Sequence, residues 1–317
     1  MTIIHHVSIV NRNGKNAFEF YRNILGLDLL MKTVNQDDNR MYHLFFGDKT
    51  GRPGTEVTIF EITEGIDKQF GTNDIDRLVF KVQSTDTLKY FMQRFDEFGV
   101  CHYGLEHYAG RDIVRFEGPD DTNLGLVVMH EDEDLSSYAI PVHTDIPEAH
   151  RIIALDSVHV RTRFSEATVK EINRYFDFEI AGKTQLFDTK LQVTIMSNQN
   201  NKDHHEIHVI HDNTSQDSIS GIGSIHHVAM SAKSLNALQQ LEEDLNNRNI
   251  LNSRIKNREF FQSLYYRDPN NILIEVATME GAKPEQPNKE SKDFNAIPLV
   301  LPEYLEPKRA EIEARLS

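Results

Sequence analysis

The stretch Ile3–Ser8 reads IIHHVS and returns near the other end of the chain, at Ser224–Ala229, as SIHHVA. In each copy a pair of histidines is framed by isoleucine and valine, a composition typical of a strand. Two copies of one histidine-bearing strand at opposite ends of a chain predict an internally repeated fold.

Working outward from these copies, the hydrophobic pattern divides the chain into four similar units. Each unit opens with a strand, continues with an amphipathic helix and ends with further strands. The opening strands are expected at Ile3–Val10, Arg77–Val82, Ser157–Thr162 and Ser224–Met230. Because the second and third openings lack the His-His pair, the pattern predicts a repeat in structure and a chemistry confined to the first and last units.

The remaining elements follow from periodicity and from helix-ending glycines. Helices are expected from about Lys15 to Leu25, between Ser84 and Gly99, around Val169–Phe176 and from Ser234 onward. The later strands are expected at Leu27–Thr33, Met41–Phe46, Glu56–Ile62, Ile113–Phe116, Leu124–Met129, Gln192–Met196, Glu206–Ile210, Phe260–Tyr266 and Ile272–Thr278.

This order of elements predicts an α+β protein made of four βαβββ modules. Residues 1–131 would form a first domain with two modules, and residues 151–280 a second domain with the other two. The acidic, proline-punctuated residues 132–150 are expected to be a linker. Residues 281–317 are expected to form an extended strap followed by a short charged helix.

Composition restricts the class of protein. The 317 residues carry a net charge of −15, which disfavours nucleic acid and anionic membranes as partners. No stretch approaches the roughly 20 apolar residues of a membrane span. The single cysteine, Cys101, excludes an intrachain disulfide and favours a reducing compartment, so a cytoplasmic location is expected.

The two His-His pairs and one acidic residue suggest a metal site. Neighbouring side chains of a strand point to opposite faces, so each pair should give the metal one imidazole, either His6 with His227 or His5 with His226. Glu275 lies in an otherwise apolar strand, where a buried carboxylate needs a strongly positive partner. Two imidazoles and one carboxylate on one face of a metal are the ligands typical of Fe(II) oxygenases.

Other residues compete for this role. Glu61, the late acid of the first unit, is a rival ligand if the units pair differently. Four histidines, His204, His205, His208 and His211, resemble a zinc cluster, but they lack helical spacing and a well-placed carboxylate. Cys101 is expected to be structural rather than reactive.

Several longer stretches, taken in order, carry a family resemblance over nearly the whole chain. They read FYRNILGL at 20–27, YHLFFGD at 42–48, GRPGT at 51–55, REFFQSLY at 258–265 and LEPKR at 305–309. Together they resemble the ring-cleaving dioxygenases of the vicinal-oxygen-chelate (glyoxalase/bleomycin-resistance) superfamily, and within it the hydroquinone-cleaving dioxygenases. The resemblance implies that the modules pair into cup-shaped mixed β-sheets, with the first unit beside the fourth.

The resemblance also implies a site and a reaction. The second histidine of each pair and the late glutamate would bind Fe(II), which Mn(II) can replace, so the implied ligands are His6, His227 and Glu275. O2 would be the co-substrate and a small hydroquinone-like or catechol-like aromatic the substrate. Catalytic roles beside the metal fall on His5, Ser8, His226, Arg258 and Tyr265. Strict alternation would turn His5 and His226 away from the metal, unless their strands are bulged.

Two other function classes fit the same scaffold. One is a metal-dependent lyase or isomerase of the glyoxalase type, which needs no oxygen and usually wants a second carboxylate as base. The other is a protein without catalysis that binds an aromatic drug or quinone. A homo-oligomer is compatible with the sequence, which does not specify the oligomeric state.

Overall fold

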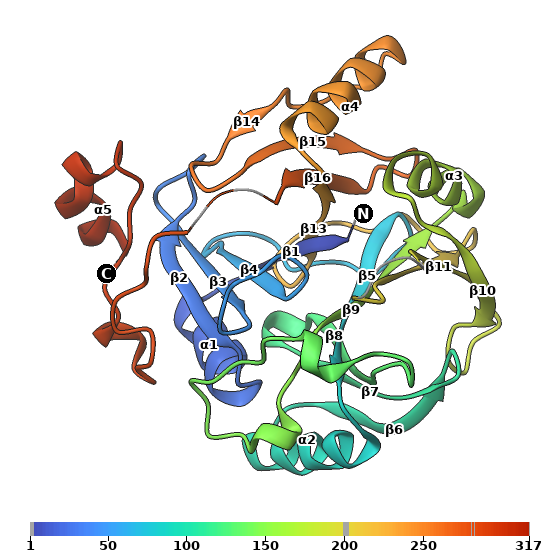
Figure 1. Ribbon diagram of the computed structural model, residues 1–317, viewed down its shortest axis with the longest axis horizontal. Coiled ribbons are helices and arrows are strands. Elements are labelled where there is room, and N and C mark those ends of the chain that lie inside the picture. The colour runs from blue at the N-terminus through green and yellow to red at the C-terminus, as the bar shows by residue number, and fades with distance from the viewer. Residues whose placement is uncertain (1–2, 199–202, 280, 282, 317) are drawn as a thin grey trace.

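A computed structural model of the chain describes residues 3–198, 203–279, 281 and 283–316. Two mixed sheets of eight strands each form its framework (Figure 1). In spatial order the first sheet contains β14 (Lys256–Asn257), β15 (Gln262–Arg267), β16 (Leu273–Thr278), β13 (Ile225–Ala232), β1 (Ile4–Asn11), β4 (Glu56–Glu61), β3 (Tyr42–Gly47) and β2 (Asp28–Val34). The second contains β10 (Glu179–Gln185), β11 (Gln192–Ser197), β12 (Glu206–His211), β9 (Ala154–Thr162), β5 (Asp74–Val82), β8 (Asn123–Val128), β7 (Arg111–Glu117) and β6 (His102–Tyr108).

The helices are few and short. The α-helices are α1 (Gly14–Phe18), α2 (Thr85–Phe98), α3 (Ser165–Phe176), α4 (Leu235–Asn247) and α5 (Arg309–Leu316), and η1 (Glu19–Ile24) is a π-helix. The 3-10 turns are η2 (Pro119–Asp121), η3 (Leu135–Ser137), η4 (Glu148–His150), η5 (Phe294–Ala296) and η6 (Glu306–Lys308). None of the helices in the described part of the chain is long and apolar enough to cross a membrane.

Each sheet combines two βαβββ units, the first and fourth in the first sheet and the second and third in the second sheet. At the centre of the first sheet, β1 of the first unit pairs antiparallel with β13 of the fourth. At the centre of the second sheet, β5 of the second unit pairs antiparallel with β9 of the third. The predicted fold class and the predicted pairing of the first unit with the fourth are therefore confirmed.

The alternation of β1 gives its sheet two different faces. Ile4, Val7 and Ile9 enter the main apolar core, which also takes residues from the second sheet and from α1 to α4. His6, Ser8 and Val10 line a cavity on the other face. The apolar residues therefore fix which side of the strand the polar ones occupy.

Two local predictions need correction. The helix expected from Lys15 to Leu25 changes at Glu19 into a π-helix, where the Leu25 N–H donates to the Phe20 carbonyl at 2.9 Å. The edge strands β6, β10 and β14 were not predicted. Most residues of β10 are exposed on both faces, and several residues of β6 are exposed. Exposed strands lack the alternation of apolar and polar residues by which a half-buried strand is predicted.

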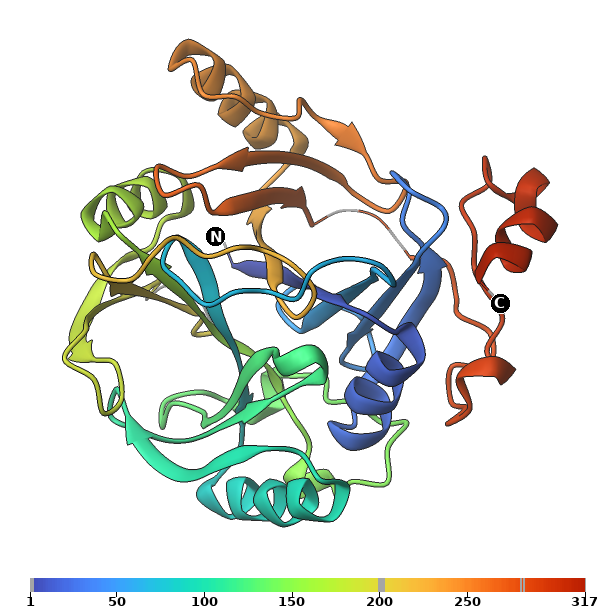
Figure 2. The ribbon, with the colours of Figure 1, turned by 180° about the vertical axis from the view of Figure 1, so that it is seen from behind.

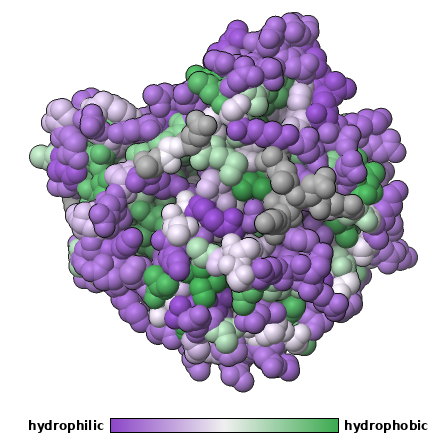
Figure 3. All heavy atoms as spheres, in the orientation of Figure 1, coloured by the Kyte–Doolittle hydropathy of each residue, from purple (hydrophilic) through white to green (hydrophobic). Residues whose placement is uncertain are grey.

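The C-terminal strap runs along the edge of the first sheet, beside β2 (Figure 2). The Val300 N–H donates to the Lys32 carbonyl at 2.8 Å. In return the Lys32 ammonium donates to the carbonyls of Phe294 and Ile297, both at 2.9 Å, and burial lowers the pKa of Lys32 to about 8. The strap thus covers an edge that would otherwise be open to another strand. Elsewhere the face in Figure 3 is mostly hydrophilic, as the net charge leads one to expect.

Candidate metal centre

A β-bulge in each of two paired strands positions the two His-His pairs. Along the β1–β13 ladder the register shifts between Ile4 and His6, which leaves His5 as an extra residue of β1. It shifts again between Ser8 and Ile9, which leaves His226 as an extra residue of β13. Because a bulge adds one residue, both members of a pair can approach the same face. The structure thus has the bulged strands that were the stated exception to strict alternation.

His6, His227 and Glu275 meet on the cavity face of the first sheet. The Nε2 atoms of His6 and His227 lie 3.2 and 2.8 Å from Glu275 Oε2, and 3.4 Å from each other. The three residues are 4%, 2% and 1% exposed. They come from β1, β13 and the neighbouring β16, three strands that lie side by side in the sheet.

The donor set fits a metal ion. Both oxygens of Glu275 are buried, and neither accepts a well-oriented hydrogen bond from the described residues, although the two imidazoles are close. Burial alone would raise the pKa of the Glu275 carboxyl, but the adjacent His6 and His227 hold it well below its usual value. An ionised, buried carboxylate without hydrogen-bond donors is costly unless a cation compensates it. Two imidazole nitrogens and this carboxylate can bind one divalent ion.

Each imidazole of the triad is held by its chain neighbour. His5 Nδ1 lies 3.0 Å from His6 Nδ1, and His226 Nδ1 lies 2.8 Å from His227 Nδ1. The Nε2 atoms that face Glu275 therefore have partners behind them that fix the rotation of the rings. Burial, followed by the neighbouring His6, lowers the pKa of His5 well below the ordinary value, so His5 is neutral near pH 7.

The triad lies in the wall of a cavity of about 400 Å³. Ser8, His226, Arg258 and Tyr265 also line this cavity, and His5 lies behind His6. Ser8 Oγ lies 2.7 Å from Thr58 Oγ1. Burial, reinforced by the Glu275 carboxylate, raises the pKa of the Tyr265 phenol, which therefore stays protonated. The rest of the wall is mainly apolar and aromatic, with Met31, Phe45, Phe60, Ile62, Phe260 and Phe261 among its residues.

A loop of the first unit holds Arg258 of the fourth. The Arg258 guanidinium donates to Asp37 Oδ2 at 2.9 Å and lies 5.4 Å from the centre of the Tyr265 ring. Gln36 Nε2 donates to the Arg258 carbonyl at 3.0 Å. Nothing in the sequence had pointed to Asp37 or Gln36. A polar residue in an exposed loop gives no signal of its own, and the interaction appears only when the two units pair.

The competing candidates lie elsewhere. Glu61 accepts a hydrogen bond from the Gly14 N–H at 2.8 Å, outside the triad. The four clustered histidines have separate surroundings. His205 accepts from the Ile4 N–H, His208 contacts Tyr108, His211 contacts Ser165, and the His204 ring lies 5.7 Å from that of His130. Cys101 is exposed.

The second sheet has the same strand pairing and the same two bulges as the first, but its corresponding positions do not carry the His-His-Glu triad. The strand pairing shows which residues of the second sheet correspond to the triad. Arg77 corresponds to His6, Ser157 to His227 and His208 to Glu275. Asp76 and Asp156 take the bulge positions of His5 and His226. Only one of the three corresponding residues, His208, is a usual metal ligand.

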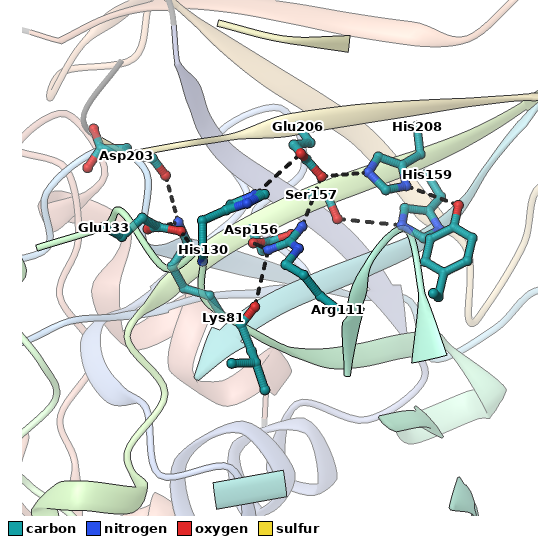
Figure 4. A network of polar contacts seen from close by, with 12 residues as sticks. Lys81, Arg111, His130, Glu133, Asp156, Ser157, His159, Asp203, Glu206 and His208 are labelled. Atoms are coloured by element: carbon teal, nitrogen blue, oxygen red, sulfur yellow. Dashed lines mark hydrogen bonds and ion pairs between the residues drawn. The ribbon is translucent and has the colours of Figure 1, made fainter. Parts of the chain in front are cut away.

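An ion-pair network occupies the second sheet's polar face instead (Figure 4). Arg111 bridges Asp156 and Glu206, at 2.7 and 2.9 Å, and His208 Nε2 lies 2.8 Å from Glu206. Lys81 pairs with Glu133. Cationic side chains of the protein thus already pair with the carboxylates that a metal would need there.

Comparison with known proteins places this chain in a family. A sequence model described as the glyoxalase/bleomycin resistance protein/dioxygenase superfamily matches residues 3–125. The chain is 35% identical over 315 residues to MhqA of Bacillus subtilis, a protein named as a ring-cleaving dioxygenase, with 99% of this chain and 98% of the relative covered. The chain belongs to the glyoxalase/bleomycin resistance protein/dioxygenase superfamily.

More distant relatives agree with this assignment. The chlorohydroquinone/hydroquinone 1,2-dioxygenase of Sphingobium indicum is 23% identical over 299 residues, with 93% of this chain and 91% of the relative covered. A crystal structure described as a dioxygenase from Bacillus subtilis has a TM-score of 0.82 at 22% identity and covers 99% of this chain and 96% of its own. Glyoxalase I from Zea mays has a TM-score of 0.63 at 12% identity and covers 88% and 93%. These two structures share the fold.

Proposed function

We propose that the protein is an Fe(II)-dependent dioxygenase that uses O2 to cleave the ring of a hydroquinone-like or catechol-like aromatic. The observation that carries the proposal is the convergence of His6, His227 and Glu275 in the wall of an aromatic-lined cavity. The names of MhqA and of the Sphingobium enzyme support the reaction class.

His6 Nε2, His227 Nε2 and the Glu275 carboxylate would hold the ferrous ion. When bound, ferrous iron supplies Lewis acidity toward a phenolate oxygen and open positions that admit O2. One carboxylate leaves the site with a net positive charge, which favours an anionic phenolate. The reactants are brought together within a cavity whose apolar walls exclude most water.

The protein's own residues would orient protons around this site. With Nε2 used as a ligand, the proton of His227 stays on Nδ1 and is donated to His226 Nδ1. Because His226 Nδ1 accepts this hydrogen bond, the neutral His226 ring carries its proton on Nε2. His226 lines the cavity, so its Nε2–H can donate to a ligand there. Tyr265 is a neutral phenol donor, and Arg258 is a permanent cation for a developing oxyanion.

The glyoxalase-type lyase remains the competing reaction. That reaction usually needs a second carboxylate as a base. Apart from Glu275, the carboxylate that the described residues bring to this cavity is Asp37. Asp37 already pairs with Arg258. This pairing favours the dioxygenase.

Oxygen uptake tests the proposal. Protein purified without oxygen and loaded with Fe(II) would be given hydroquinones, with catechol for comparison. We expect oxygen consumption and a ring-opened product in the wild type, and loss of both in His227→Ala and Glu275→Ala. Fully iron-loaded protein that consumes no oxygen with any phenol would refute the dioxygenase.

A further inference from the structure

Two polar side chains in the cavity wall have no role in the metal site or its surroundings. They are Thr33 on β2 and His43 on β3, directly opposite each other in the antiparallel ladder. Both line the cavity. We call them the distal pair. Their neighbours on the same wall, Met31, Phe45 and Phe60, are apolar or aromatic.

The distal pair lacks the hydrogen bonds that buried polar groups normally have. Thr33 is 4% exposed, and neither its Oγ1 nor His43 Nε2 has a hydrogen-bond partner among the described residues. A buried donor or acceptor without a partner costs about 1–3 kcal/mol. Two such groups side by side in an otherwise apolar wall indicate that a ligand supplies their partner.

The ring of His43 is held in place by aromatic contacts. It stacks on Phe60, with centroids 4.1 Å apart and planes at 25°, and its centroid is 4.2 Å from that of Phe45. Burial, and then the nearby His6 and His227, lowers the pKa of His43 well below its ordinary value. A neutral imidazole offers one donor and one acceptor, and the Thr33 hydroxyl offers both. This combination suits a hydroxyl group better than a carboxylate or a cation.

Phe60 relates the distal pair to the metal triad. Its ring centroid is 4.1 Å from that of His43 and 6.4 Å from that of His227. Because the triad and the distal pair line the same cavity, we expect a ligand with one oxygen at the triad to present the opposite side of its ring to the distal pair. A 1,4-dihydroxy ring has its second oxygen on that far side, whereas a catechol has both oxygens at the same end.

We propose that Thr33 and His43 bind the second hydroxyl of the substrate and thereby select 1,4-dihydroxy aromatics. This inference rests on the proposed function for its choice of ligand and adds the residues that recognise it. Neither residue belongs to the candidate ligand triad, so both would act by orienting the ring.

Equilibrium binding without oxygen tests the distal pair separately from turnover. The probes are hydroquinone and 4-methylphenol, which have similar shape and differ in the second hydroxyl, titrated by calorimetry into Fe(II)-loaded protein. We expect the wild type to prefer hydroquinone by about tenfold, the equivalent of one good hydrogen bond. The double variant Thr33→Val/His43→Phe should lose this preference while it binds 4-methylphenol as the wild type does.

A matched control makes the same chemical changes away from the cavity. The same two substitutions at exposed residues outside the cavity, Thr189→Val/His107→Phe, should retain the preference for hydroquinone. A preference that survives in the double variant, or a wild type that binds both phenols equally, would overturn the role of the distal pair. A wild type that prefers hydroquinone but consumes no oxygen would instead overturn the dioxygenase and leave the distal pair standing. Binding of neither phenol by the wild type would overturn both.

Discussion

At the scale of single residues, one extra amino acid in each of two paired strands decides where the histidines point. Strict alternation would send His5 and His226 to the apolar core, but the bulges keep them beside His6 and His227. The repeated His-His string was enough to predict that these strands carry the site. A bulge in an apolar strand does not change the types of residue present, so it cannot be predicted from composition. The sequence therefore left open whether the first or the second histidine of each pair is the ligand.

The His5–His6 contact leads to a prediction about metal affinity. His5→Phe keeps an aromatic ring but removes the Nδ1 partner that orients His6. Partners of this kind typically contribute a factor of about 10–100 in metal affinity. We expect the dissociation constant for Fe(II) to rise by about that factor, measured by competition with a chelator. His107→Phe, the same change at an exposed histidine, is the control and should have no effect.

The loop contact to Arg258 leads to a prediction about substrate binding. Asp37→Asn removes the anion that holds the guanidinium, so Arg258 should sample more orientations. We expect KM for the phenol to rise by about 3- to 10-fold with a smaller change in kcat, because a positioning contact acts mainly on binding. Asp38→Asn is a matched control, since Asp38 pairs with Arg40. Equal effects of the two changes would argue against a role specific to Asp37.

At the scale of elements, the sequence predicted central strands well and edge strands poorly. β1, β5, β9 and β13 are buried on both faces or nearly so, and their apolar runs are unambiguous. β10 at a sheet edge is mostly exposed, so solvent rather than packing determined its composition. The π-helix after α1 was missed for another reason, because a change from α to π spacing alters hydrogen bonds without altering residue types.

A histidine at the start of β12 ties the second sheet to β1 and makes stability depend on pH. His205 Nδ1 accepts from the Ile4 N–H at 3.1 Å, so the fold requires a neutral imidazole. Burial lowers the pKa of His205 from 6.5 to about 4. This contribution is complete above about pH 6.5, where the unfolded chain is also neutral, and is lost as the pH falls toward 4.

Denaturant unfolding at pH 7.5 and pH 5 would check this dependence. The unfolded chain gains a proton on His205 below pH 6.5 and the folded protein does not. At about 1.4 kcal/mol per pH unit, the wild type should lose about 2 kcal/mol of unfolding free energy more than His205→Gln over this interval. Parallel losses in both proteins would mean that His205 already titrates normally in the folded state.

At the scale of the whole molecule, two sheets of like topology carry different chemistry. The corresponding positions hold His6, His227 and Glu275 in one sheet and Arg77, Ser157 and His208 in the other. The repeat in the sequence already confined the His-His pairs to the outer units. It did not reveal the ion pairs of the inner sheet, because these join residues from separate strands and loops.

The difference between the sheets predicts one metal ion per chain. Elemental analysis of protein equilibrated with Fe(II) without oxygen should give about one equivalent for the wild type and almost none for His227→Ala. His208→Gln, a change at the corresponding region of the second sheet, should retain one equivalent. Two equivalents in the wild type, or a loss in His208→Gln, would place metal in the second sheet.

Because the first unit pairs with the fourth, the ribosome makes the two halves of the first sheet at different times. During synthesis Glu275 is added 269 residues after His6, roughly 15–50 s later at about 5–20 residues per second. The second sheet, whose strands lie between Asp74 and His211, can close first, and β1 has β4 as a neighbour but lacks its antiparallel partner until β13 emerges. The nascent chain therefore cannot bring the three candidate ligands together until Glu275 has emerged. Ribosome-bound chains stalled before Glu275 should take up no metal, while released full-length chains should.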